Sequence, residues 1–174
     1  ARTFQNTRLF AEMTALENVM VGRHIRTESG LMGAIFRTGS FKAEEAAIAK
    51  RAQELLDYVG IGKYADYKAR TLSYGDQRRL EIARALATDP KLIALDEPAA
   101  GMNATEKVQL RELIDQIRKD NRTILLIEHD VKLVMGLCDR VTVLDYGKQI
   151  AEGTPATVQK DQKVIEAYLG TGGH

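Results

Sequence analysis

The spacing of apolar residues in the first half of the chain predicts two amphipathic helices. One is expected to start after Thr14, because Thr14 and Glu17 match a capping box and an apolar stripe follows them. A longer helix is expected over residues 43 to 59, where apolar residues share one face and Gly60 can supply the C-terminal cap. Residues 27 to 41 resemble an irregular insertion, and no strand is expected before residue 88.

The pattern changes after Pro90. Residues 92 to 95 form a short, wholly apolar run, which is typical of a strand buried on both faces of a parallel sheet. A helix capped by Asn103 is expected next, and residues 123 to 127 predict a second buried strand. Two parallel strands joined by one helix predict a right-handed βαβ unit.

The remaining residues predict a short helix, a hairpin and a helical end. Asp130 can cap the helix, and residues 141 to 151 match two strands about a turn at 145 to 148. Helical structure is expected again from 154 to 169. The expected fold class is therefore α/β, with a helical front half and an α/β back half.

Composition narrows the class of protein without choosing a function. The chain has 174 residues, of which 44% are hydrophobic, enough for one globular domain. Lys and Arg number 25 against 24 Asp and Glu, so nothing points to a nucleic-acid partner. No apolar run approaches the roughly 20 residues that span a bilayer. The single cysteine, Cys138, is expected to be a packed thiol.

Two acidic residues follow the first predicted strand. Asp96 and Glu97 would lie at the carboxyl end of a parallel strand, where open α/β sheets bind ligands. One carboxylate can serve Mg²⁺, and the next can orient or deprotonate a water. An ordinary polar loop fits the same pair, so the rest of the chain has to decide between these interpretations.

A second candidate site lies at the start of another predicted helix. Residues 72 to 79 read Leu-Ser-Tyr-Gly-Asp-Gln-Arg-Arg and precede an apolar helical pattern. They place the Ser73 hydroxyl and Gly75 at a helix N-terminus, which offers N–H groups and a positive dipole end to an anion. Ser73 as an ordinary N-cap is the alternative interpretation.

Residues 72 to 86 resemble the signature motif of ABC ATPases, usually written L-S-G-G-Q and followed by a helix that ends A-R-A-L. Residues 92 to 97 resemble the Walker B strand of that family, His129 its switch histidine and Gln5 its Q-loop glutamine. The four motifs occur in family order across essentially the whole chain. The resemblance implies a P-loop NTPase-type fold and ATP hydrolysis coupled to transport, with ATP and Mg²⁺ as cofactors.

The resemblance also implies a role for each matching residue. Two ATPase subunits would sandwich ATP, so that Ser73 and Gly75 contact the γ-phosphate of a nucleotide bound to the opposite subunit. Glu97 is the implied base, and His129 the implied γ-phosphate contact. The implied nucleotide-binding residues are Gln5, Ser73, Gly75, Asp76, Asp96 and Asn103, of which Gln5 and Asp96 also serve Mg²⁺.

Within the family, the segments around these motifs are most similar to branched-chain amino acid importers. Those segments are residues 72 to 77, 96 to 103, 137 to 140, 145 to 148 and 152 to 155. Three features depart from the usual pattern. Tyr74 replaces the first signature glycine, Asp76 stands at the fifth position, and Ala-Gly-Met-Asn at 100 to 103 replaces the commoner S-A-L-D of the D-loop. We interpret them as subfamily variants.

The motifs divide the chain into three expected parts. Residues 1 to 88 hold the Q-loop and the α-helical signature subdomain, residues 89 to 153 the Walker B, D-loop and switch-histidine part, and residues 154 to 174 a helical tail.

The chain contains no Walker A loop, G-x-x-x-x-G-K-[ST]. In a P-loop NTPase that loop cradles the phosphates, so this chain alone is expected to show no measurable ATP hydrolysis. The start at Ala1, with no initiator Met, resembles a cut chain. A shortened parallel sheet is expected to expose apolar faces, through which the chain would self-associate.

The resemblance implies transmembrane permease subunits, a second ABC ATPase subunit and, indirectly, a periplasmic amino-acid-binding protein as partners. Gln5, Leu9, Phe10 and Met13 are expected to line the groove that receives a cytoplasmic helix of the permease. The protein would then lie peripherally on the cytoplasmic face of the inner membrane. Two alternatives stay open: an ATPase of lipid or polysaccharide export, and a non-catalytic docking or dimerisation fragment.

Overall fold

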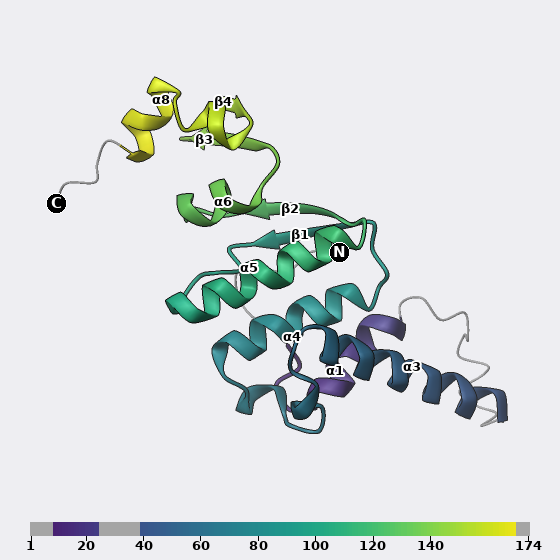
Figure 1. Ribbon diagram of the computed structural model, residues 1–174. Helices are drawn as coiled ribbons and strands as arrows, with labels where there is room; N and C mark the ends of the chain where they lie inside the picture. Colours follow the sequence, from purple (N-terminus) through teal and green to yellow (C-terminus); the bar gives the residue numbers. More distant parts are fainter. Residues whose placement is uncertain (1–8, 25–38, 170–174) are drawn as a thin grey trace. The chain divides into compact units, whose positions relative to one another are not determined.

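The computed structural model describes residues 9–24 and 39–169 (Figure 1). They belong to two compact units, divided between Ile127 and Glu128, and each unit is considered by itself. The Q-loop glutamine expected at Gln5 lies outside the described residues. The three-part division expected from the motifs stays a prediction.

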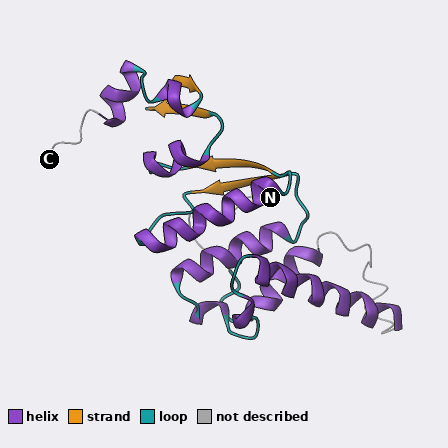
Figure 2. Cartoon of the chain, viewed as in Figure 1, coloured by secondary structure: helices purple, strands orange, loops and turns teal. Residues whose placement is uncertain are grey.

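The front of the first unit is helical, as predicted (Figure 2). Its elements are α1 (Ala15–His24), α3 (Gly39–Tyr58), the 3₁₀ turns η1 (Gly62–Tyr64) and η2 (Ala69–Thr71), and α4 (Tyr74–Leu86). The capping box before α1 is confirmed, because Glu17 N donates to Thr14 Oγ1 at 3.1 Å and Thr14 N to Glu17 Oε2 at 2.7 Å. Before residue 88, the described residues contain no strand, only an isolated bridge between Thr14 and Lys68.

Helix α3 begins earlier than predicted. It runs over Gly39–Tyr58, so residues 39 to 41, which were expected in an irregular insertion, are helical. A first helical turn tolerates glycine and serine, since its N–H groups need no partner within the helix. Gly60 follows the helix with φ of +81°, as expected of the glycine that ends it. The earlier part of the expected insertion, residues 27 to 38, lies outside the described residues.

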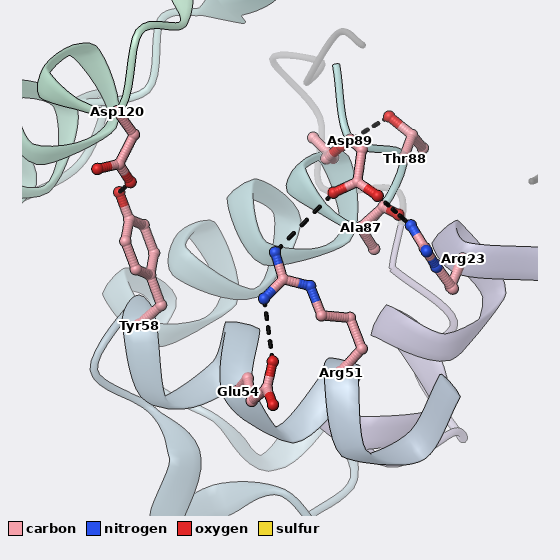
Figure 3. Close-up of polar contacts among 9 residues, drawn as sticks. Arg23, Arg51, Glu54, Tyr58, Ala87, Thr88, Asp89 and Asp120 are labelled. Atoms are coloured by element: carbon pink, nitrogen blue, oxygen red, sulfur yellow. Dashed lines mark hydrogen bonds and ion pairs between the residues drawn. The ribbon is translucent and has the colours of Figure 1, made fainter. Parts of the chain in front are cut away.

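Polar contacts fasten α1 and α3 to the segments beyond α4 (Figure 3). Asp89, which follows α4, forms an ion pair with Arg23 of α1 and a longer one, at 3.9 Å, with Arg51 of α3. Tyr58, at the end of α3, donates its hydroxyl to Asp120 Oδ2 at 2.8 Å. Partial burial and this hydrogen bond raise the pKa of Tyr58 well above its usual value. The helical front is therefore held at two separate points.

A parallel strand pair follows, joined by one helix as predicted. Strand β1 (Leu92–Asp96) pairs in parallel with β2 (Thr123–Ile127), and α5 (Ala104–Lys119) connects them. The register places Leu92 opposite Thr123 and Asp96 opposite Ile127. The apolar stripe of α5 is buried and consists of Leu110, Leu113, Ile114 and Ile117.

The prediction that both strands are buried on both faces is wrong. Ile93 and Leu95 are buried, but Leu92, on the opposite face of β1, is 48% exposed. On β2 the same open face carries Leu125 and Ile127, which are 53% and 44% exposed. Alternate residues of a strand point to opposite faces, so among the described residues one face of the pair is covered and the other is an open apolar surface.

The second unit contains the predicted helix and hairpin. Its elements are α6 (Val131–Leu137), β3 (Val141–Asp145), β4 (Lys148–Gly153), α7 (Pro155–Val158), α8 (Gln162–Val164) and the π-helical turn η3 (Ile165–Leu169). Strands β3 and β4 are antiparallel about Tyr146 and Gly147, whose φ values are +44° and +77°. Cys138 packs against the small core around Val158, as expected of a structural thiol. Among the helices described in either unit, none is long and apolar enough to cross a membrane.

The open face of β1 and β2 predicts that the chain self-associates at micromolar concentration. Burying exposed leucine and isoleucine side chains lowers the free energy by about 25 cal/mol for each Å² of apolar surface removed from water. We expect Leu125→Lys to lower the mass measured by multi-angle light scattering. Val108→Lys is the control, because Val108 is 57% exposed on α5 instead of the sheet. A monodisperse monomer of the unsubstituted chain would contradict the prediction.

Candidate functional site

Helix α4 begins with a serine cap whose hydroxyl is engaged by Asp76. Ser73 Oγ accepts from Asp76 N at 3.2 Å and donates to Asp76 Oδ2 at 2.8 Å. Ser73 is exposed, so this polar pair lies at the surface. The N–H groups of the first turn of a 13-residue helix point the same way, toward its N-terminus. The N-cap, which the sequence offered as the alternative interpretation of Ser73, is present, and it leaves the Ser73 hydroxyl and the helix N-terminus at the surface.

Gly75 makes room for a carboxylate from the next helix. A Cβ on residue 75 would lie 2.8 Å from Glu106 Oε1. The other oxygen, Oε2, accepts from Asn103 N at 2.9 Å, while Asn103 Oδ1 accepts from Glu106 N at 3.0 Å, which completes a capping box on α5. Two of the predicted residues, Gly75 and Asn103, thus meet through Glu106, while Ser73 and Asp76 pair with each other. The sequence predicted a helix capped by Asn103 but gave no signal for the contact between Glu106 and Gly75.

Asp96 and Glu97 lie at the carboxyl end of β1, as predicted. Asp96 is the last residue of the strand and pairs with Ile127 of β2. Glu97 follows with φ of +44°, a conformation that few residues other than glycine adopt. Its backbone N–H donates to Ile127 O at 2.8 Å, which holds this left-handed residue against the neighbouring strand. Such backbone geometry often accompanies a functional role.

His129 belongs to the second unit and follows Glu128. Its imidazole is 71% exposed, with Nδ1 3.9 Å from Glu128 Oε2. The Glu128 carboxylate is 1% exposed and accepts from the backbone N–H of His129 at 3.1 Å. Asp130 then caps α6 by accepting from Leu133 N. A buried carboxylate thus fixes the backbone under an exposed imidazole.

Within the first unit, Asp96 and the start of α4 offer groups that suit magnesium and phosphate. Three or more acidic, histidine or cysteine side chains gather nowhere among the described residues in a way that could hold a metal alone. Magnesium commonly takes only one or two carboxylates and completes its ligands with phosphate and water, a role that Asp96 can fill. The start of α4 offers donors that suit a phosphate oxygen. Acceptor and donor groups are thus present, without a loop that encloses the phosphates.

Two family profiles match the chain. The profile described as ABC transporter matches residues 1–100, and the profile described as branched-chain amino acid ATP-binding cassette transporter matches residues 148–174. Together they cover both ends of the chain, including the signature and Walker B segments.

Similar proteins agree with these profiles. The high-affinity branched-chain amino acid transport ATP-binding protein LivG of Escherichia coli K12 is 48% identical over 97% of this chain and 67% of its own length. The corresponding protein BraF of Pseudomonas aeruginosa is 45% identical over the same shares. The lipopolysaccharide export system ATP-binding protein LptB of E. coli K12 is 32% identical over 95% of this chain and 63% of its own.

Solved structures agree with the predicted fold class. The ADP conformation of MJ1267, an ATP-binding cassette of an ABC transporter, matches with a TM-score of 0.78 and 33% identity over 98% of this chain and 68% of that one. A dimeric post-hydrolysis state of the cassette MJ0796, bound to ADP and Pi, matches with a TM-score of 0.71 and 26% identity over 88% and 62%. The P-loop NTPase-type α/β fold of ABC ATPases is confirmed.

Proposed function

The chain belongs to the ABC transporter family of ATP-binding proteins, and we propose that it is the signature-bearing part of an ATPase subunit that drives uptake of branched-chain amino acids. The observation that supports the proposal is the start of α4, where Ser73 is exposed at the helix N-terminus and Gly75 lies against Glu106 of α5. The 48% identity to LivG, against 32% to LptB, favours amino-acid import over lipopolysaccharide export.

The start of α4 would contact a nucleotide held by a second ATPase subunit. Ser73 would donate its hydroxyl, and the first N–H groups of the helix would donate beside Gly75. Asp76 takes part through Ser73, because its carboxylate now accepts the hydroxyl proton that a phosphate oxygen would receive. Asn103 would contribute from the start of α5. The dimeric cassette bound to ADP and Pi supports this arrangement.

Asp96 and Glu97 would have different roles at the end of β1. Bound ATP would supply the phosphoryl group, and its Mg²⁺ would neutralise part of the charge on the phosphates. Asp96 would offer a carboxylate oxygen to the magnesium, with Gln5 as a further ligand. Glu97 would orient a water and accept its proton. For His129, in the second unit, the family resemblance implies a γ-phosphate contact.

The 174 residues by themselves would not hydrolyse ATP. Phosphoryl transfer depends on positioning and electrostatic stabilisation, and the chain has no G-x-x-x-x-G-K-[ST] loop to supply them. ATP hydrolysis is therefore measured in a form of the subunit in which a Walker A loop accompanies these residues.

Glu97→Gln tests the role of the base. We expect the variant to bind Mg²⁺-ATP normally and to lose ATP hydrolysis by a factor on the order of 10² or more, because general-base catalysis is removed while nucleotide contacts remain. ATP turnover and uptake of labelled leucine into proteoliposomes with the permease provide the two measurements. Glu112→Gln, an exposed residue of α5, is the matched control. Unchanged turnover in Glu97→Gln would remove Glu97 from the role of base.

Leucine uptake also separates the remaining alternatives. Uptake that depends on ATP supports import of branched-chain amino acids, with a periplasmic binding protein delivering the substrate. ATP hydrolysis that lipopolysaccharide stimulates, without leucine uptake, would favour lipid export instead. A subunit that docks but never hydrolyses ATP would favour a non-catalytic role.

The permease would dock on an exposed apolar surface of the helical part. Phe10, Met13 and Tyr67 are 47%, 39% and 55% exposed. Their segments lie side by side, since Ala15 N donates to Tyr67 O and Ala69 N donates to Met13 O, each at 2.9 Å. Exposed apolar groups gathered in this way suit an amphipathic helix of a membrane subunit. Such docking would place the protein on the cytoplasmic face of the membrane.

Tyr67→Ala tests this docking surface. Aromatic residues often dominate interface energies, so we expect permease association in detergent to weaken roughly tenfold or more. Tyr146→Ala is the control, because Tyr146 is 99% exposed in the hairpin turn of the second unit. Equal association of the two variants would place the docking surface elsewhere.

A further inference from the structure

The ring of Tyr74 packs against Gly101, in the segment that follows Glu97. A Cβ on residue 101 would lie 3.3 Å from Tyr74 Cε1, and Gly101 has φ of +73°. Both the close ring and the left-handed backbone therefore favour glycine at this position. Tyr74 and Gly101 also lie in the two motifs that depart from the family's usual residues. The large Tyr74 in the signature motif thus packs against the small Gly101 in the D-loop segment.

Arg78 fixes the position of the Tyr74 ring. Its Nε and Nη2 donate to Tyr74 Oη at 3.1 and 2.8 Å, and its Nη1 donates to Glu81 Oε2 at 2.9 Å. The Arg78 and Glu81 side chains are each 3% exposed. Burial alone lowers the pKa of Arg78, but the hydrogen bonds to Glu81 and Tyr74 outweigh it and raise the pKa. The hydroxyl of Tyr74 is thus anchored to a buried ion pair.

Two tight turns connect Gly101 to Glu97. Ala100 N donates to Glu97 O, and Met102 N donates to Ala99 O, each at 3.2 Å. Gly101 lies within the second turn, and Glu97 begins the first. Because the turns overlap at residues 99 and 100, a displacement of Gly101 would move the backbone that carries Glu97.

We propose that Tyr74 and Arg78 are positioning residues for ATP hydrolysis, which act through Gly101 to set the backbone of residues 97 to 102 and the place of the Glu97 carboxylate. The inference rests on the proposed function, because this positioning has a kinetic consequence only where Glu97 is the base. It makes the start of the signature helix a structural support for the catalytic residue of the same chain.

Tyr74→Phe tests the anchor, in the subunit form that carries a Walker A loop. The ring stays against Gly101, but the oxygen that accepts from Arg78 is lost. If the lost hydrogen bond to Arg78 stabilises the transition state, its loss should lower kcat on the order of tenfold. The KM for ATP should stay within about twofold. Tyr146→Phe is the matched control, on a tyrosine that is 99% exposed, and should change neither constant.

A double-mutant cycle tests the contact with Gly101. In the unsubstituted subunit, Gly101→Ala meets both the Tyr74 ring and the unfavourable positive φ. In a Tyr74→Gly background only the unfavourable φ remains, so Gly101→Ala should reduce kcat by a smaller factor there. Equal factors in the two backgrounds would show that the ring does not act through Gly101 and would overturn the proposal.

The outcomes separate this inference from the proposed function. ATP hydrolysis by the unsubstituted subunit, with unchanged kcat in Tyr74→Phe, overturns the positioning role and leaves the proposed function standing. A lower thermal unfolding temperature in Tyr74→Phe with unchanged kcat indicates a purely structural contact and likewise overturns it. An unsubstituted subunit that never hydrolyses ATP refutes the proposed function, and the positioning role falls with it.

Discussion

The carboxylate of Glu106 joins the start of helix α5 to the start of helix α4. One oxygen caps the backbone of Asn103, and the other occupies the space that a side chain on Gly75 would need. An added Cβ would approach that oxygen to 2.8 Å, so any side chain at residue 75 would displace the Glu106 carboxylate from its present position. The N-terminal end of α4 and the start of α5 are therefore joined by this carboxylate within the first unit.

Local sequence signals predicted the elements and most of the candidate residues. Capping boxes such as Thr14 with Glu17 depend on residues three apart, so their hydrogen bonds follow from the sequence alone. Asp96 and Glu97 were placed correctly because an apolar run ends directly before them. The cysteine and the hairpin were also predicted, since each depends on neighbours close in the chain.

Contacts between distant residues could not be predicted in the same way. Tyr74 of α4 packs on Gly101 in the loop before α5, and Glu106 of α5 packs on Gly75 of α4. Nothing in the local sequence patterns indicates either contact. The prediction that β1 and β2 are buried on both faces was wrong for a related reason. An apolar run shows that a strand can be covered on both faces, but not whether the described residues supply the cover, and Leu125 stays 53% exposed.

In the proposed function, the start of α4 and the carboxylates at the end of β1 contact the phosphates of a nucleotide that is held mainly by other residues. Isothermal titration of the 174-residue chain with Mg²⁺-ATP, after its intact mass and N-terminal sequence are checked, tests this most directly. We expect no micromolar binding, because the helix N-terminus and the carboxylates at the end of β1 do not enclose the phosphates. Micromolar binding would contradict the account, since the chain would then hold a complete nucleotide site without a Walker A loop.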